Sequence, residues 1–144
     1  MPYSPLLVRP MREELTSAGF AELFTPEDVD RFLAERHGTA LLVINSVCGC
    51  AAGMARPGVR LALQEGPRPD RLATVFAGQD VEATARARHH FGDIPPSSPS
   101  MALYKDGELV WFLPRHRIEG RDALAVAADL RGAFAAHCAT PAVR

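Results

Sequence analysis

Apolar and polar residues alternate along this chain in patterns that predict four strands and five helices. The run 41–47 is apolar and rich in β-branched residues. Only Asn45 and Ser46 near its end interrupt it, which is typical of a buried interior strand. Two shorter apolar runs flank Lys105-Asp106-Gly107, a turn sequence that predicts a β-hairpin. The predicted strands are 39–47, 72–77, 101–104 and 109–113, and the predicted helices are 10–18, 26–37, 50–65, 80–91 and 118–138.

Local signals indicate where these helices begin and how they pack. Thr25 and Asp80 are expected to cap the helices that follow them, because their side-chain oxygens can accept bonds from the first unpaired N–H groups. Pro57 is expected to kink its helix, since proline lacks a backbone N–H and clashes with the preceding turn. In the last helix, Leu124 belongs to an apolar stripe that should pack on the sheet.

From residue 39 onward, the predicted order is strand, helix, strand, helix, hairpin, helix. Because crossovers between parallel strands are right-handed, the first two strands should be parallel neighbours, and the hairpin should add antiparallel strands. This is a thioredoxin-like arrangement: an α/β fold with a mixed central sheet flanked by helices, here preceded by two extra N-terminal helices. We expect a single domain over 1–144, with a core over about 39–138 and an N-terminal helical extension over about 8–37.

A proline lies just before the predicted hairpin. In thioredoxin-like proteins a cis-proline occupies that place and faces the cysteines, and the residue before it pairs with the backbone of the substrate. Ser98 and Pro99 lie at the matching position in this chain. We therefore expect Ser98 and Pro99 to contact the substrate, together with Gly49 of the cysteine motif described below.

Charge and composition indicate which classes of binding partner this chain is not expected to have. The chain has 144 residues, a formal net charge of −1 and a pI near 6.5. Nothing in that charge favours binding to nucleic acid or to an anionic membrane. No apolar run approaches the roughly 20 residues that cross a bilayer, and residues 1–5 lack the basic start and apolar core of a secretory signal. We therefore expect a cytoplasmic protein without nucleic-acid or membrane partners.

Two of the three cysteines stand where the first strand ends and the next helix begins. A helix that starts at Cys50 would turn unpaired N–H groups and the positive end of its dipole toward Cys48. That environment favours the thiolate, which is the nucleophile in thiol chemistry. A Cys-x-Cys disulfide closes a very small ring, and Gly49 tolerates the turned backbone that the ring requires. Such a disulfide should be easily reduced, which predicts thiol exchange with Cys48 attacking and Cys50 resolving.

Other roles for the cysteines remain open. Both could be structural, or the Cys-x-Cys pair could hold a metal, although a closed zinc site needs about four ligands and no recognised metal spacing is present. An acyl-transfer cysteine with a histidine base is a further alternative, without an oxyanion or triad pattern to support it. Cys138 taken alone is interpreted as a small residue near a helix end. Residues that could complete a metal site are His89, His90, His116, His137 and Cys138.

A short basic segment, Arg115-His116-Arg117, follows the hairpin. It is interpreted first as a solvated surface loop. If the segment lies near Cys48, its charge would favour the thiolate or an acidic thiol substrate. The pair His89-His90 lies on a polar helix and is interpreted as solvated.

Sequence motifs are spread over the chain. Around the cysteines, residues 45–53 are Asn-Ser-Val-Cys-Gly-Cys-Ala-Ala-Gly, followed by Ala55-Arg56-Pro57. Further motifs are Val-Phe-Ala-Gly-Gln-Asp at 75–80, Pro-Ser-Ser-Pro-Ser-Met-Ala-Leu at 96–103, and the segments 10–15, 114–116, 118–120 and 133–138. Together they closely resemble the bacilliredoxin family. The likeness runs in order over nearly the whole chain without large gaps, which makes it highly specific.

The resemblance implies a thiol–disulfide oxidoreductase that serves cell redox homeostasis by removing bacillithiol from S-bacillithiolated client proteins. Bacillithiol is a small thiol made of glucosamine, malate and cysteine that replaces glutathione in some bacteria. Cys48 would attack the mixed disulfide, and Cys50 or a second bacillithiol would release it. An NADPH-dependent flavin reductase would regenerate the thiol pool. The chain itself would bind no cofactor or metal, and it contains no dinucleotide fingerprint.

Two alternative functions stay open beside this one. The first is a general protein disulfide reductase or isomerase, because members of the family have also been described as weak isomerases. The second is a Cys-x-Cys metal-binding module. The C-terminal cysteine of the family corresponds to Cys138, which could pair transiently or cap a packed helix.

Overall fold

The computed structural model describes residues 3–47 and 49–138, with the backbone alone for Cys50. Along this part of the chain, five helices, five strands and one short 3₁₀ helix follow one another. The helices are α1 (Pro5–Thr16), α2 (Pro26–Ala34), α3 (Gly49–Ala62), α4 (Val81–His89), the 3₁₀ helix η1 (Arg115–Arg117) and α5 (Ala123–His137). The strands are β1 (Ala21–Glu22), β2 (Thr39–Asn45), β3 (Arg71–Phe76), β4 (Ser100–Lys105) and β5 (Glu108–Leu113).

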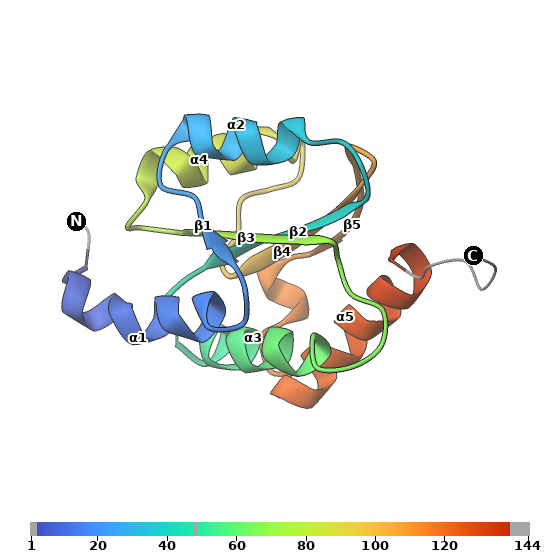
Figure 1. Cartoon of the computed structure of the whole chain (residues 1–144). Coiled ribbons are helices and arrows are strands. Elements are labelled where there is room, and N and C mark those ends of the chain that lie inside the picture. The colour runs from blue at the N-terminus through green and yellow to red at the C-terminus, as the bar shows by residue number, and fades with distance from the viewer. Residues whose placement is uncertain (1–2, 48, 139–144) are drawn as a thin grey trace.

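The strands form one mixed sheet in the order β1-β3-β2-β4-β5. Strand β2 pairs in parallel with β3 and antiparallel with β4, and β4 pairs with β5 in the hairpin. Figure 1 shows α2 and α4 covering one face of this sheet, with α1, α3 and α5 on the other. The mixed sheet, the parallel first pair, the antiparallel hairpin and the flanking helices are confirmed.

Strand β2 is the buried centre of the fold, with all seven of its residues buried. Leu41 and Val43 pack into the core on the side of α3 and α5, whereas Leu42 and Ile44 pack into the core on the side of α2 and α4. The alternation follows from the pleat of the strand. Because helices cover both faces, β2 needs apolar residues at nearly every position. The chain therefore leaves the sheet from a rigid, fully packed strand.

The N-terminal part of the fold differs from the prediction in two ways. Helix α1 begins at Pro5 and not at Pro10, because Ser4 accepts a bond from the Leu6 N–H and proline fits the first turn. Strand β1 was not predicted; it pairs in parallel with β3 at the edge of the sheet. Two residues are too few to show a recognisable alternation, so the sequence carries no signal for β1.

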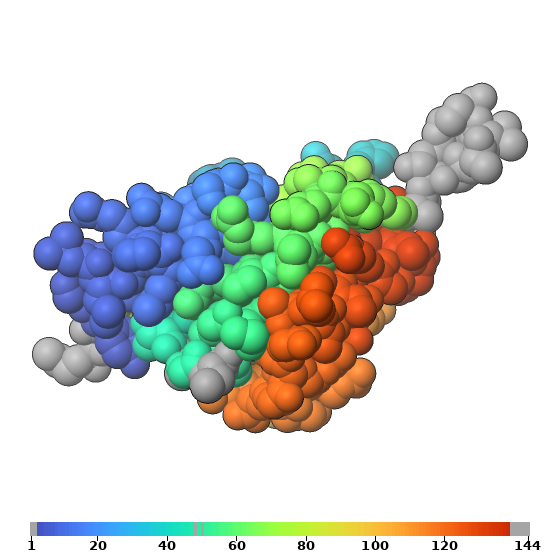
Figure 2. All heavy atoms as spheres, turned by 90° about the horizontal axis from the view of Figure 1, so that it is seen from below, coloured from blue at the N-terminus to red at the C-terminus, as the bar shows by residue number. Residues whose placement is uncertain are grey.

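Helices α3 and α5 pack closely against each other at Gly58. A Cβ atom at this position would lie 2.7 Å from Val126 Cγ1 and 3.2 Å from the Ala123 carbonyl oxygen, so a larger residue would push the helices apart. Figure 2 shows α3 beside α5, with α1 along its other side. Helix α3 continues through Pro57 without a break. Helix α3, which begins within the cysteine motif, therefore lies between α1 and α5.

The predicted helix ends are confirmed only in part. Thr25 forms the expected cap of α2. Leu124 does not pack on the sheet and is 69% exposed, because in the first turn of α5 it lies on the solvent side, whereas Val126 of the same turn is fully buried. Asp80 stands at the start of α4 without making a side-chain cap bond. Its carboxylate instead accepts hydrogen bonds from the Arg12 guanidinium at 2.9 and 3.1 Å, which ties α1 to the end of β3.

Candidate active site

Gly49 and Cys50 begin α3 a few residues after β2 ends, so the predicted change from strand to helix occurs at the cysteine motif. Cys48 is outside the described residues, and Cys50 contributes backbone to the first turn of α3. Gly49 has a φ of +47°, in the left-handed region that favours glycine. Its N–H donates to the Val47 carbonyl at 2.8 Å. The chain thus turns directly from the sheet edge into α3, while stabilisation of a Cys48 thiolate by the helix end stays a prediction.

The proline before the hairpin lies at the same edge of the sheet. The Ser98–Pro99 peptide bond is cis. The next residue, Ser100, pairs with Ile44 near the end of β2, so residues 97–99 lie beside the segment that leads to the motif. The fold therefore brings Ser98 and Pro99 to the end of β2 from which Gly49 follows. Their contact with a substrate stays a prediction.

Arg56 of α3 is a buried cation beside the loop that leads to the motif. The residue is only 8% exposed, and its Nη1 donates to Asn45 Oδ1 at 3.1 Å and to the Ser46 carbonyl at 2.7 Å. Its Nε donates to the Glu14 carboxylate of α1 at 2.9 Å. The Asn45 amide in turn donates to the Met11 carbonyl at 3.1 Å. One guanidinium thus joins α1, the end of β2 and α3.

No role for Arg56 was predicted from the sequence, although the residues around it indicate that this arginine is buried. Arg56 is a charged residue on a helix whose neighbouring positions Ala52, Ala55 and Val59 are apolar and buried. A buried guanidinium must find a counter-ion and hydrogen-bond acceptors, because its desolvation is otherwise costly. Such a position predicts an internal polar network. It does not identify the partners, which come from β2 and α1.

Arg115 joins the basic segment 115–117 to the cis-proline segment through hydrogen bonds. Its backbone N–H donates to Ser97 Oγ at 3.2 Å, and its Nη1 donates to the Ser98 carbonyl at 3.1 Å. Its Nε donates to the Glu119 carboxylate at 3.0 Å. The other two basic residues of the segment are exposed. Arg115 therefore borders the candidate site, and the interpretation of the whole segment as a solvated loop is wrong for this residue.

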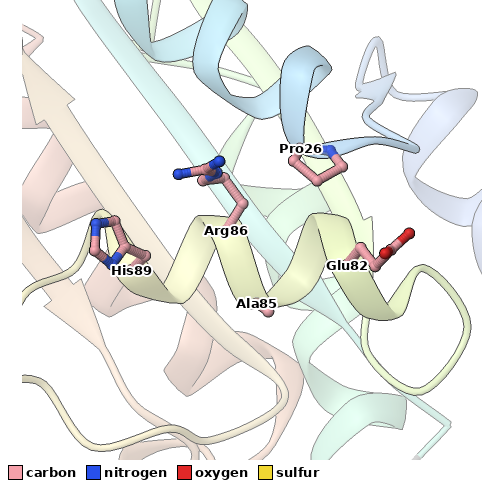
Figure 3. Close-up of a pocket in the computed structure, with 5 residues that line it drawn as sticks. All are labelled: Pro26, Glu82, Ala85, Arg86 and His89. Atoms are coloured by element: carbon pink, nitrogen blue, oxygen red, sulfur yellow. The ribbon is translucent and has the colours of Figure 1, made fainter.

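The histidine pair lies on a different surface. His89 and His90 are exposed, and His90 Nε2 lies 2.8 Å from Asp30 Oδ1 of α2. Figure 3 shows the shallow hollow between α2 and α4, where Arg86 points toward α2 and His89 lies near the end of α4. Gly49, Ser98 and Pro99, the fully described residues among those predicted for the active site, do not line this hollow. The two histidines are solvated, as expected.

Metal sites and membrane segments are two further features that bear on function. Among the residues that the structure describes, no three or more His, Cys, Asp or Glu side chains gather closely enough to hold a metal ion. Within the same residues, no helix is both long enough and apolar enough to cross a bilayer. Neither finding covers Cys48 or the side chain of Cys50, which are outside the described part of the chain.

Cys138 lies at the opposite end of the sheet from the motif. It forms the C-cap of α5, and its thiol interacts with Thr39, the first residue of β2. A seven-residue strand spans about 20 Å, whereas a disulfide needs Cα atoms within about 7 Å. Pairing with Cys50 is thus excluded within this fold. The alternative that Cys138 ends a packed helix is confirmed, and burial raises the pKa of its thiol.

Cys138→Ala is expected to leave thiol exchange within about twofold of the unmodified chain, because residue 138 does not reach the motif. The raised pKa keeps the Cys138 thiol protonated near neutral pH, so its alkylation should be slow there and accelerate only at a higher pH than that of an ordinary exposed thiol. Peptide mass spectrometry after timed iodoacetamide labelling measures this rate. Labelling of Cys138 as fast as that of Cys48 at neutral pH would contradict the prediction.

Nearly the whole chain matches proteins of one family. The family model described as "Disulphide isomerase" matches residues 3–138. A bacilliredoxin from Halalkalibacterium halodurans is 53% identical over 136 residues, and one from Shouchella clausii is 55% identical over 136 residues, each match covering 94% of both chains. A bacilliredoxin from Salinibacter ruber is 55% identical over 140 residues, which is 96% of this chain and 81% of the relative. The chain belongs to the bacilliredoxin family.

Solved structures of thioredoxins share the fold of this member of the bacilliredoxin family. A mutant thioredoxin from Halobacterium salinarum gives a TM-score of 0.57 at 16% identity, over 85% of this chain and 94% of that one. A thioredoxin from Malassezia sympodialis gives 0.55 at 13% identity, over 84% and 92% of the two chains. At such identities the likeness shows the fold alone, and it confirms the thioredoxin-like class. Family and fold together make the protein a thiol–disulfide oxidoreductase.

Proposed function

We propose that this member of the bacilliredoxin family removes bacillithiol from S-bacillithiolated client proteins. The observation that carries the proposal is the position of Gly49 and the first turn of α3, which follow the buried strand β2 at the sheet edge where the cis-proline segment lies. We propose Cys48 and Cys50 as the catalytic residues, and Gly49, Ser98 and Pro99 as the residues that hold the substrate. The names of the curated relatives support bacillithiol as the thiol.

In the first step, the Cys48 thiolate attacks the bacillithiol sulfur of the mixed disulfide. A new disulfide joins Cys48 to bacillithiol as the bond between bacillithiol and the client sulfur breaks. The electron pair leaves with the client sulfur, which then takes up a proton. The N-terminal end of α3 and the buried Arg56 guanidinium both favour the anionic form of Cys48. The client cysteine is thereby returned in its reduced form.

Cys48 can then be released by either of two routes. The Cys50 thiolate can attack the Cys48 sulfur, which expels bacillithiol as a thiolate and leaves a Cys48–Cys50 disulfide. Alternatively, a second bacillithiol attacks the bacillithiol sulfur of the adduct, which frees Cys48 and forms bacillithiol disulfide. An NADPH-dependent flavin reductase would reduce that disulfide in the cytoplasm. In this scheme the chain binds no cofactor, and bacillithiol is a substrate.

The proposal is tested by mass spectrometry of the reduced protein after brief incubation with a bacillithiolated model peptide. We expect a bacillithiol adduct on Cys48, or the Cys48–Cys50 disulfide that follows it, together with the free peptide thiol. The same peptide carrying an ordinary thioether at its cysteine is the control, because it offers no disulfide to attack. Unchanged peptide with no modification on any cysteine would overturn the proposal.

Disulfide isomerisation is a second candidate function, favoured by the description of the matching family model. It would use the same two cysteines on disulfides within one protein, without bacillithiol. The two activities are compared at equal protein concentration, with a scrambled ribonuclease and a bacillithiolated peptide as substrates. Faster removal of bacillithiol is expected. Faster recovery of the ribonuclease would favour the isomerase.

A further inference from the structure

Two arginines from different elements donate to adjacent carbonyls of the cis-proline segment. Arg88 of α4 donates through Nη2 to the Ser97 carbonyl at 3.4 Å, and Arg115 of η1 donates through Nη1 to the Ser98 carbonyl at 3.1 Å. This segment continues into β4, whose first residue pairs with Ile44 near the end of β2. Both guanidinium groups therefore lie close to the sheet edge that carries the cysteine motif.

Arg88 is a half-buried cation that has no acidic partner among the described residues. Its Nε atom is buried and makes no hydrogen bond within that part of the chain. Its one bond, to Ser97, is long for an N–H···O contact. Burial lowers the pKa of the guanidinium, but an arginine keeps its charge in proteins and offers five N–H donors. Most of this binding capacity is not used by the neighbouring residues.

Arg115 has a counter-ion that a ligand can replace. Its partner Glu119 follows four residues later, and the two side chains are 34% and 53% exposed. Such a pair contributes little free energy in water, whereas a guanidinium matches the planar geometry of a carboxylate. The Ser98 carbonyl, at the position where thioredoxin-like proteins pair with a substrate backbone, already accepts a bond from Arg115. Arg115 therefore places a positive charge, able to bind an anionic group, beside the predicted substrate-binding residue Ser98.

We propose that Arg115 and Arg88 form a carboxylate-binding subsite that selects the small-thiol half of the mixed disulfide. The inference rests on the proposed thiol exchange and adds the class of thiol that the site accepts. A thiol that carries carboxylate groups places them against the two guanidinium groups while its sulfur faces the cysteine motif. Bacillithiol meets this requirement through its malate group, and an uncharged thiol does not.

The test uses two mixed disulfides of the same peptide, one with mercaptosuccinate, which carries two carboxylates, and one with uncharged mercaptoethanol. The measured quantity is the ratio of the two kcat/KM values. The unmodified protein is expected to prefer the charged probe, and Arg115→Gln is expected to lower the ratio about tenfold, the loss of one charge-assisted hydrogen bond. Arg88→Gln should lower the ratio in the same direction. Arg115→Lys, which keeps the charge, should restore part of the preference.

Arg117→Gln is the matched control, because it removes the same charge from the exposed end of the same 3₁₀ helix. It should change the ratio by less than about twofold, as expected for a screened surface charge. An equal fall in the ratio for Arg117→Gln would indicate diffuse attraction and overturn the subsite. Equal turnover of both probes by the unmodified protein would overturn it while leaving thiol exchange in place.

Two further outcomes separate the subsite from its alternatives. If Arg115→Gln lowers both kcat/KM values by the same factor, the arginine only braces the cis-proline segment and the subsite is wrong. If the unmodified protein turns over neither probe, the exchange activity itself is overturned, and this inference fails with it.

Discussion

Cys48→Ser is expected to reduce the removal of bacillithiol from a model peptide by about a thousandfold or more, since the attacking group is lost. A serine hydroxyl does not ionise near neutral pH and cannot form the disulfide that carries bacillithiol away. The fold should tolerate the change, because serine is close to cysteine in size and residue 48 follows the packed strand β2. The release of peptide thiol, measured with a chromogenic disulfide, gives the rate.

Cys50→Ser is the paired variant, with one thiol removed and the nucleophile retained. It should still take up bacillithiol in a single turnover and then stay as the Cys48 adduct until an external thiol is added. Intact-protein mass spectrometry detects this adduct as the added mass of one bacillithiol. Full activity in Cys48→Ser, or an adduct on Cys50 in that variant, would show that the roles of the two cysteines are assigned wrongly.

The sequence predicted the parts of the fold whose residues carry a strong local pattern. Strand β2 was predicted because burial on both faces leaves an uninterrupted apolar run, and the β4–β5 hairpin because Asp106 and Gly107 adopt the positive φ values that its turn needs. Strand β1 escaped prediction because two residues show no alternation. Leu124 was misplaced because an apolar residue in the first turn can lie on the solvent side of a helix, as it does in α5.

The candidate site, too, was predicted only in part. Cys48, Gly49 and Cys50 were predicted from their spacing and their place after a buried strand, and Ser98 with Pro99 from the order of the elements. The contacts of Arg56, Arg88 and Arg115 were not predicted. Each of these arginines acts through partners that are far away in the sequence, and a long side chain can reach several neighbouring elements. Only the packed structure decides which acceptors it meets.

Arg56 is the arginine with the largest expected effect on the fold. Its guanidinium is almost completely withdrawn from water, and it bonds to Asn45, Ser46 and the Glu14 carboxylate. A buried cation stabilises a fold only when its bonds are satisfied, and removal of such a cation leaves polar partners buried without their donor. The end of β2 and the start of the motif loop should therefore depend on this residue.

Arg56→Met is expected to lower the free energy of unfolding by about 3 kcal/mol. Methionine fills much of the space but donates no hydrogen bond to the loop or to α1. Arg60→Met is the matched control, because Arg60 lies on the same helix, is exposed, and joins α3 to the Glu14 carbonyl and to Ser17. It should cost less than about 1 kcal/mol. Urea unfolding of both variants, followed by circular dichroism, measures the difference.

A positioning role for Arg56 predicts an effect on the thiol that a purely structural role does not. Loss of the positive charge beside Ser46 should raise the pKa of the Cys48 thiol, because a nearby cation favours the thiolate. The alkylation rate of Cys48 in Arg56→Met would then rise at a higher pH than in the unmodified protein. Arg56→Lys keeps the charge but cannot make the full set of hydrogen bonds. It should therefore bring the pH profile of Cys48 alkylation closer to that of the unmodified protein, while restoring less of the lost stability. An unchanged pH profile in Arg56→Met, measured where the variant is still folded, would show that Arg56 only braces the fold.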